Sequence, residues 1–391
     1  MIDRFHVTAF KSLEDVTVDL GRVNVFVGAN GSGKSNLLEA LGVLSSAARG
    51  RVDDESLQRR GVRPGLPDRY RTAFPDAHLK AQIRFEATGQ DASYDVGLWH
   101  RADLSEPAWR YHTELLKQRG RKLVGRSPNL QKKLDPESGY AALKLVEIDK
   151  AAPAAKLLHL ISSYRIFSPT TPHLRGLVPD ESRGRPVGLS GGRLAEALAE
   201  IIHDRTRGGE EIKAELLGLI EWASNVDVVP VEKAKLSRSV PSPQIVVRFT
   251  DRYMAKAHGY LSAYDASEGA LYVLFAAVLA LHPAAPRVLA IDNVDHSLNP
   301  RLARALVEKF CGWVLSRPQR QVLLTSHNPV VLDGLPLLDD RVRLFTVDRT
   351  TSGRTRVKRV KIDAKILDKA KKGWTLSRMW VAGLIGGVPD V

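Results

Sequence analysis

The segment "GANGSGKS", from Gly28 to Ser35, matches the pattern G-x-x-x-x-G-K-[ST] in full. An apolar stretch, Val23 to Val27, precedes it and an apolar-periodic segment follows it, which predicts a strand, a turn and a helix in that order. Glycines allow successive backbone N–H groups to point at one anion, and the start of a helix adds partial positive charge. An accidental glycine turn would lack this ordered context, so the segment predicts a site for the phosphates of a nucleotide.

Two side chains in this segment have specific expected roles. Lys34 is expected to neutralise the β- and γ-phosphates of ATP, and the Ser35 hydroxyl is expected to bind Mg²⁺. The other residues that we expect to contact the nucleotide are Gly28, Asn30, Gly31, Ser32, Gly33 and Asn36.

Two later apolar segments end in side chains that suit the same chemistry. "VLAIDNVDHSL" predicts a buried strand that ends at Asp292, whose carboxylate would reach the Mg²⁺ ion. "VLLTSHNP" leaves His327 at the end of the following strand, where it could donate a hydrogen bond to the γ-phosphate or to the attacking water. Because ligands collect at the carboxyl ends of strands in open α/β sheets, we expect both side chains to lie near the glycine-rich turn.

The elements that must position these residues alternate along the chain. Alternating or β-branched runs predict three N-terminal strands, a hairpin around "TGQD" within 78–100, and further strands such as "SPQIVVRFT". Apolar periodicity predicts helices at 154–163, 190–204, 209–223, 268–282 and 300–316. This order predicts an α/β fold with a parallel or mixed sheet, flanking helices, and antiparallel β and helical insertions.

The composition limits the class of protein. The chain has 391 residues, of which 43% are hydrophobic, so it can form a substantial core. Its longest apolar run, 270–281, is shorter than the roughly 20 residues that span a bilayer, and its first residues lack the apolar region of a signal peptide. The only cysteine, Cys311, excludes an internal disulfide and reads as a buried structural thiol. We expect a soluble, cytoplasmic protein with no membrane partner.

The chain is strongly basic, with a formal charge of +14 and a pI near 9.8. Basic residues cluster at Lys117–Arg126 and Arg354–Lys372. Such an excess suggests DNA or RNA as a possible partner, and a solvated, arginine-rich surface is the alternative. The alternation "RVKRVKI" in the second cluster favours an exposed strand face. A phosphate-binding patch is the second interpretation.

Together, the phosphate-binding turn, the acidic strand end and the strand-end histidine resemble the ABC-type P-loop ATPases. Among them the chain is most similar to the soluble RecF-, SMC- and OLD-like proteins, because "FKSLEDVTVDLGRVNVFVGANGSGKSNLLEAL" is similar to their opening segment. The resemblance implies one ABC-type ATPase domain over residues 1–391. We expect it to comprise a P-loop lobe (1–76), an antiparallel β insertion (77–150), a helical and β insertion (151–250), and a lobe carrying the signature, the acidic strand and a C-terminal docking element (251–391).

The resemblance also assigns a signature motif. In "ASEGALYVLFAAVLAL", Ser267 and Gly269 stand where the family has Ser-x-Gly at the start of a helix, which implies that they contact ATP held by a second subunit. Ser267 is also expected to cap that helix. "GLSGGRLAEAL" (188–198) is a competing signature, but it lies far ahead of the acidic strand and reads better as a helix start. "HSLN" (296–299) stands where the family has the loop that crosses the dimer interface.

One position departs from the family pattern. The family has glutamate where this chain has Asn293, and an amide cannot accept a proton from water, although it can orient water by hydrogen bonding. Asp295 could supply the missing carboxylate. Two hypotheses therefore stand: a slow ATPase completed by Asp295, and an ATP-binding scaffold that hydrolyses poorly. The glutamine that senses the γ-phosphate has two candidates, Gln58 and Gln82.

The resemblance implies partners as well. ATP would be sandwiched between two copies of the chain, in a dimer or a higher assembly. About 60 residues follow His327, too few for the Toprim nuclease domain of many OLD-like proteins, so a nuclease or toxin effector would be a separate chain. Antiphage defence or genome maintenance is the expected setting, with RecF-like DNA repair as the alternative.

Overall fold

The apolar segment ahead of the glycine-rich turn forms β3 (Val23–Val27), a strand in which every residue is buried. It pairs in parallel with β13 (Gln321–Ser326) on one side and with β14 (Val342–Arg349) on the other. The central sheet has the order β15-β14-β3-β13-β12-β8, in which β12 (Val288–Ile291) and β8 (Arg165–Phe167) continue the parallel arrangement and β15 (Thr355–Val360) is antiparallel. The strands that end in the expected site residues are therefore neighbours, with their carboxyl ends at one edge.

This computed structural model describes residues 1–65, 67–75, 82–99, 109–127, 141–180, 184–204, 208–234, 236 and 244–387. The expected boundary between residues 76 and 77 lies outside the described residues. The hairpin predicted within 78–100 is confirmed as β4 (Ile83–Gly89) and β5 (Ala92–Trp99), although residues 78–81 and 100 lie outside the described ranges.

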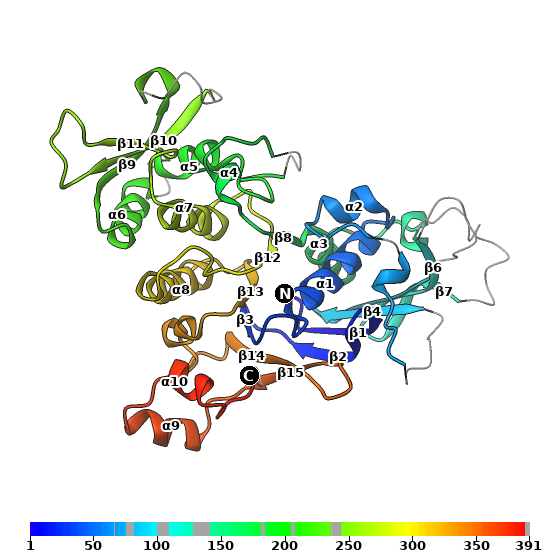
Figure 1. Ribbon diagram of the computed structural model, residues 1–391. Helices are drawn as coiled ribbons and strands as arrows, with labels where there is room; N and C mark the ends of the chain where they lie inside the picture. The colour runs from blue at the N-terminus through cyan, green and yellow to red at the C-terminus, as the bar shows by residue number, and fades with distance from the viewer. Residues whose placement is uncertain are drawn as a thin grey trace.

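The two faces of the central sheet support two hydrophobic cores. Val25 of β3 packs with the core that contains α7 (Glu268–Leu281) and α8 (Pro300–Leu315). Phe26, on the opposite face, stacks on Phe345 at 4.9 Å between ring centroids. The second core also contains α1 (Lys34–Ala48) and α3 (Pro153–Ser163), so α1 lies between two sheets and is buried along most of its length. Figure 1 shows α1 and α3 on one side of the central strands and α7 and α8 on the other.

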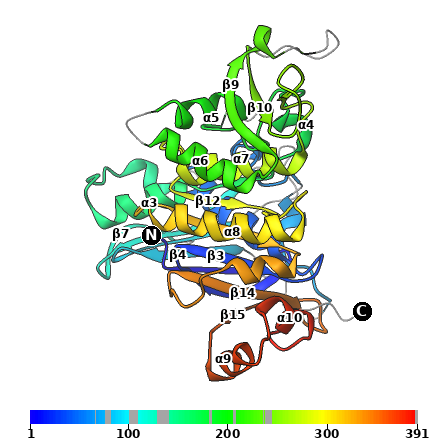
Figure 2. The same ribbon diagram turned by 90° about the vertical axis from the view of Figure 1, so that its left-hand side faces the viewer.

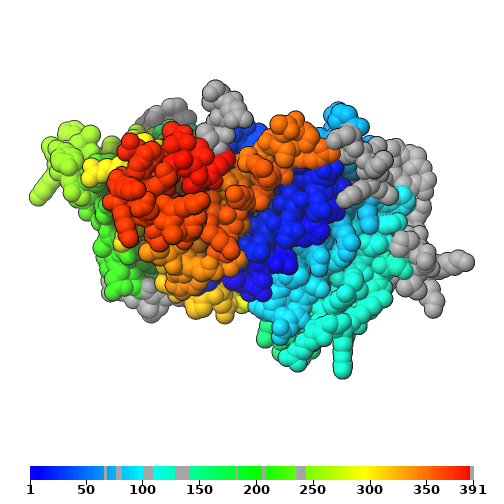
Figure 3. Space-filling view, turned by 90° about the horizontal axis from the view of Figure 1, so that it is seen from below, coloured from blue at the N-terminus to red at the C-terminus, as the bar shows by residue number. Residues whose placement is uncertain are grey.

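The sheet beyond α1 is antiparallel, with the order β2-β1-β4-β5-β6-β7. Its remaining strands are β1 (Arg4–Phe10), β2 (Leu13–Asp19), β6 (Arg110–Gln118) and β7 (Arg121–Arg126). The first two predicted strands thus join the strands of the predicted insertion in one sheet. Figure 3 shows the blue N-terminal part of this sheet between its cyan part and the orange β14–β15 region. The short elements near this sheet are α2 (Asp54–Gln58), η1 (Pro67–Tyr70) and η4 (Ala142–Leu145).

A third layer covers α7 on its outer side (Figure 2). It contains α5 (Leu194–Ile202), α6 (Gly209–Leu219) and a sheet of order β11-β10-β9, with β9 (Ala223–Pro230), β10 (Ile245–Asp251) and β11 (Tyr260–Ser262). The helix predicted at 190–204 begins only at Leu194, because Gly191 has a positive φ of 99°. The helix predicted at 209–223 ends at Leu219, and Ala223 already begins a strand. Two short elements accompany the layer, α4 (Thr171–Leu174) and η6 (Val231–Lys233).

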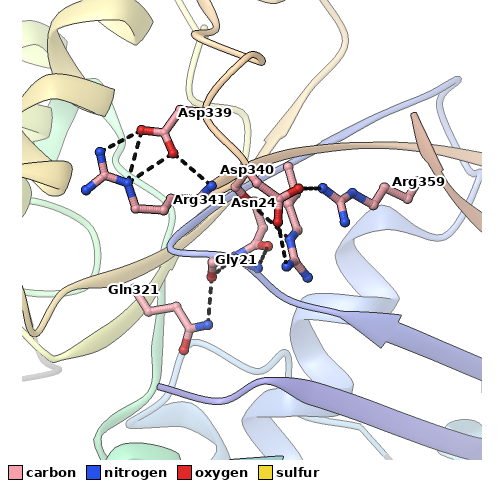
Figure 4. A network of polar contacts seen from close by, with 8 residues as sticks. Gly21, Asn24, Gln321, Asp339, Asp340, Arg341 and Arg359 are labelled. Carbon is pink, nitrogen blue, oxygen red and sulfur yellow. Dashed lines mark hydrogen bonds and ion pairs between the residues drawn. The ribbon is translucent and has the colours of Figure 1, made fainter. Parts of the chain in front are cut away.

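A polar network ties together the amino ends of the central strands (Figure 4). Gln321 donates to the carbonyls of Ile2 and Gly21 at 2.8 Å, and Asn24 donates to the Gly21 carbonyl at 3.0 Å. On the adjoining turn, Asp339 accepts from Arg341, and Asp340 pairs with Arg359 of β15. These bonds fix the end of the sheet that lies opposite the expected site.

The last elements are η7 (Pro329–Gly334), α9 (Ala364–Lys371) and α10 (Leu376–Val381). Ser377, in α10, donates its hydroxyl to Asp333 at 2.5 Å, which holds this helix on η7. Within the described residues, no helix is both long enough and apolar enough to cross a membrane.

Candidate nucleotide site

The glycine-rich turn between β3 and α1 has a shape that only glycine allows at two positions. A Cβ at Gly28 would lie 2.0 Å from the Val347 carbonyl oxygen, and one at Gly33 would lie 2.1 Å from Thr355 Oγ1. Gly33 also has a φ of 108°, which side chains rarely tolerate. The turn is therefore packed from outside by β14 and β15.

Lys34 is held ready inside this turn. Its Nζ donates to the carbonyls of Gly28 and Ala29, each at 2.8 Å, and lies 3.3 Å from His327 Nδ1. Burial lowers the pKa of Lys34 to about 8, although Asp292 and Asp295 act in the opposite direction. A buried ammonium whose closest partners are carbonyl oxygens and an imidazole nitrogen favours an incoming anion such as phosphate.

Ser35 and Asp292 form the expected metal position. Ser35 Oγ donates to Asp292 Oδ2 at 2.9 Å, and Thr325 Oγ1 donates to Asp292 Oδ1 at 2.5 Å. The backbone fixes the strand end as well, because Asp292 N donates to the Phe167 carbonyl at 3.0 Å. Hydroxyl and carboxylate oxygens suit Mg²⁺, which commonly takes one or two protein oxygens and completes its shell with phosphate and water. The residues present fit a Mg²⁺ ion held together with a nucleotide.

His327 follows β13 and points toward Lys34. Burial and the charge of Lys34 lower the pKa of His327, against the opposing effects of Asp295, the Gly28 backbone and Asp292. A neutral imidazole at this position can donate a hydrogen bond without adding a second full positive charge.

The unusual asparagine has a special backbone conformation. Asn293 has a φ of 57°, and its N–H donates to Thr325 Oγ1 at 2.8 Å. Asn293 Oδ1 and Asp295 Oδ1 are both buried, and neither accepts a hydrogen bond within the described residues. The charge of Asp295 acts on both Lys34 and His327, so this carboxylate lies within electrostatic reach of the phosphate position. Two acceptor oxygens near one site can bind and orient a water molecule.

Two functional candidates were missed by sequence reasoning. A cavity of about 100 Å³, which we call the P-loop cavity, is lined by Ser35, Asp292, Glu39 and Arg63. Arg63 Nε donates to Glu39 Oε1 at 2.6 Å. Burial would raise the pKa of Glu39, but the bond from Arg63 and the charge of Lys11 outweigh it and lower that pKa. Glu39 lies one helical turn after Ser35, a spacing that could have identified it. Arg63 lies in a segment without periodicity, which carried no such signal.

The signature residues lie elsewhere. Ser267 caps α7 by accepting from Ala270 N at 3.4 Å, and a Cβ on Gly269 would lie 3.3 Å from the Ser297 carbonyl oxygen. Together with Trp222 and Arg301 they line a second cavity of about 590 Å³, the signature cavity. The structure thus brings Ser267, Gly269 and the "HSLN" loop together, but not into the P-loop cavity of the same chain.

The remaining candidates take other positions. The turn of the competing signature is held by Asp180, which accepts from Ser190 N at 2.9 Å, and Thr170 N donates to the Ser190 carbonyl. Gln58 ends α2 with an exposed side chain, and Gln82 accepts from Thr113 of the antiparallel sheet at 3.3 Å. Neither glutamine lines the P-loop cavity among the described residues.

Comparisons with known proteins agree with this geometry. Residues 23–333 match the family described as "AAA domain, putative AbiEii toxin, Type IV TA system". No curated protein matches the chain in sequence. A crystal structure of an SMC head bound to the C-winged helix domain of ScpA is 13% identical, with a TM-score of 0.53, and the match covers 95% of this chain and 99% of that one.

Two further SMC heads are also similar. One, from Thermotoga maritima, is 12% identical with a TM-score of 0.44, and covers 92% of this chain and 99% of its own. The other, with an extended coiled coil and bound to the C-terminal domain of ScpA derived from Pyrococcus furiosus, is 12% identical with a TM-score of 0.47, covering 95% and 98%.

The family match extends over most of the chain and includes the glycine-rich turn, the acidic strand and the strand-end histidine. The similarity to the first SMC head shows that the same fold continues over nearly the whole length. The chain belongs to this AAA-domain family, and its fold is similar to that of the first SMC head.

Proposed function

We propose that this chain is a slow, Mg²⁺-dependent ATPase that closes around ATP as a dimer or higher assembly and controls a separate effector protein. The observation that carries this proposal is the division of the site into two cavities. Ser35, which directly follows Lys34 in the chain, lines one of them together with Asp292, while Ser267 and Gly269 line the other. A nucleotide bound at Lys34 would therefore gain contacts to a signature helix only from a second copy of the chain.

The setting that we propose is antiphage defence or genome maintenance, with a nuclease or toxin as the effector. The family description refers to an AbiEii toxin and a type IV toxin–antitoxin system, and the SMC head of similar fold is bound to a domain of another protein. Both support a role in which the ATPase acts together with a partner. Co-purification with the product of a neighbouring open reading frame, in the presence and absence of ATP, tests this part.

Assembly can be tested by light scattering with ATP and Mg²⁺. We expect the wild type to form a dimer or larger species on adding ATP, and Lys34→Ala to stay unchanged because it lacks the phosphate contact. Ser267→Arg should bind ATP but fail to assemble, since the arginine would fill the signature cavity. Ser224→Arg, an exposed position on β9, is the matched control and should assemble normally. Normal assembly of Ser267→Arg would contradict the proposal.

Asn293 favours a second candidate, an ATP-binding scaffold in which hydrolysis plays little part. An amide cannot serve as a general base, and removing such a base lowers rates by about 10²–10⁴-fold. Single-turnover hydrolysis with excess protein separates the candidates, using wild type, Asp295→Ala and Lys34→Ala. If wild type and Asp295→Ala both hydrolyse no faster than Lys34→Ala, the scaffold is the correct function.

Direct binding of DNA, as in a RecF-like repair ATPase, receives less support from the basic clusters. In the second cluster, Arg354 pairs with Glu14, Arg356 with Asp348, and Arg359 with Asp340. The three carboxylates neutralise the charge of these three arginines, as expected for an exposed strand. Titration of DNA at low and high salt tests this alternative, because phosphate contacts weaken steeply with salt.

A further inference from the structure

A third cavity lies close to the P-loop cavity and has a different character. It occupies about 320 Å³ beside α2 and the start of β8, which is within the size range of small-ligand pockets. Five arginines line it: Arg49, Arg51, Arg59, Arg60 and Arg165. We call it the arginine cavity.

The carboxylates of the arginine cavity do not balance its positive charge. Only Asp53 and Glu55 are acidic among its lining residues, and they pair with Arg51 and Arg59. The other three arginines, Arg49, Arg60 and Arg165, have no carboxylate partner among the described residues. The cavity therefore keeps a formal excess of three positive charges.

Arg60 gives the strongest evidence for an anion site, because only 5% of it is exposed. Its guanidinium donates to two neutral oxygens, Ser45 Oγ at 2.9 Å and the Ser56 carbonyl at 2.6 Å. Burial and the nearby charges of Arg49 and Arg165 lower the pKa of Arg60 to about 10. A buried, unpaired cation beside like charges is costly, and an anion in the cavity would remove that cost.

We propose that the arginine cavity binds a phosphate-bearing ligand other than the P-loop nucleotide, through Arg49, Arg60 and Arg165. Planar guanidinium groups present paired N–H donors that match phosphate oxygens, and several of them around one cavity favour a doubly charged group. The ligand would be either a free phosphorylated small molecule or the phosphorylated end of a nucleic acid, which share this chemistry.

The arginine cavity adjoins the P-loop cavity, so a ligand bound in it could affect the nucleotide site. Two backbone segments line both cavities: Arg59 and Arg60 face the arginine cavity, whereas Gly61 and Arg63 face the P-loop cavity. Likewise, Arg165 lines one and Ile166 the other, and Ile166 N donates to the Arg60 carbonyl at 2.8 Å. This bond joins the two segments, so a ligand that shifts Arg60 or Arg165 would move the wall of the P-loop cavity.

The test uses full-length Lys34→Ala, in which the phosphate-binding turn is disabled, and calorimetric titration with pyrophosphate. We expect saturable binding to Lys34→Ala, weakened by about tenfold or more when Arg49→Gln and Arg165→Gln are added. Arg119→Gln with Arg121→Gln, on exposed positions of the β6–β7 hairpin, removes the same charge and should leave binding unchanged. Arg49→Gln alone, at an exposed position, serves if the double variant unfolds.

Oligonucleotides with and without a 5′-phosphate distinguish the two sources. If the ligand is a nucleic-acid end, the 5′-phosphorylated strand competes with pyrophosphate and the 5′-hydroxyl strand does not. If it is a small molecule, neither strand competes. Equal affinity of Lys34→Ala for pyrophosphate with and without the cavity substitutions, or no binding at all, would overturn the proposal. Because Lys34→Ala is the background, this outcome is independent of whether the chain binds or hydrolyses ATP.

Discussion

The Ser35 hydroxyl lies 2.9 Å from Asp292 Oδ2, although the two residues are 257 positions apart in the chain. The bond joins the start of α1 to the end of β12, and both groups are ligands that Mg²⁺ prefers. Ser35 and Asp292 would hold a Mg²⁺ ion, which would neutralise part of the charge of the phosphates.

Asp292→Asn should therefore lose Mg²⁺-dependent activity while retaining the fold. The amide keeps the size of the carboxylate and can still accept from Thr325, so we expect a small change in melting temperature. Hydrolysis should fall by about 10²-fold or more, because the metal supplies several kcal/mol of charge stabilisation. Stopped hydrolysis assays over a Mg²⁺ series measure this effect, and an unchanged Mg²⁺ dependence would contradict the assignment.

Affinity for ATP should fall as the pH rises above about 8. The pKa of Lys34 in the free protein is lowered to about 8, and a bound phosphate would raise it again. The bound state then holds more protons than the free state above that pH, so raising the pH weakens binding. Titration with a fluorescent ATP analogue across this range measures the slope. Lys34→Arg stays charged and should show a flatter profile.

Asn293→Glu should accelerate hydrolysis if the side chain at this position faces the attacking water. A restored general base could raise the single-turnover rate by about 10²-fold or more. The positive φ of 57° at this position disfavours glutamate, so the variant should also be less stable by about 1 kcal/mol. Asn293→Gly accepts the same φ without supplying a base and should show no acceleration. Equal rates for both variants would place the catalytic carboxylate elsewhere, with Asp295 next to be tested.

Gly28→Ala should abolish nucleotide binding and lower the melting temperature, because its Cβ would meet the Val347 carbonyl oxygen. Gly31→Ala should be milder, since nothing lies within 4 Å of its Cβ and only its φ of 75° opposes the change. Gly312→Ala, in α8 with open space around its Cβ, is the control and should stabilise the helix by about 0.5–1 kcal/mol. Thermal melts and ATP titrations of the three variants test this order.

Much of the central sheet was predictable because its strands are short, apolar and end in recognisable residues. Val23–Val27 and Val288–Ile291 are buried on both faces, so each appears in the sequence as a continuous apolar run. Lys34 and Asp292 follow these runs and indicate the edge of the sheet at which the site lies. Ser267 was expected to cap the helix that follows it, and it does so in the structure.

The parts that were not predictable depend on contacts between distant segments. Glu39 is an acidic residue in a helix whose other residues follow an apolar pattern. It can be buried because Lys11 and Arg63, from two other segments, form ion pairs with it. The arginine cavity likewise combines residues from α2 and from the start of β8. Sequence spacing reports neighbours on one element, whereas these sites form where separate elements meet.

The partners of β3 have a consequence for how this protein is made. The residues of β3 are synthesised early, but the strand pairs with β13 and β14, which lie about 300 residues later. Before those strands leave the ribosome, the valines of β3 have no sheet to join, and the glycine-rich turn lacks Val347 and Thr355 as its outer support. A nascent or truncated chain that stops before β14 should therefore have no nucleotide site at all, and ATP could stabilise only a chain whose synthesis has passed that strand.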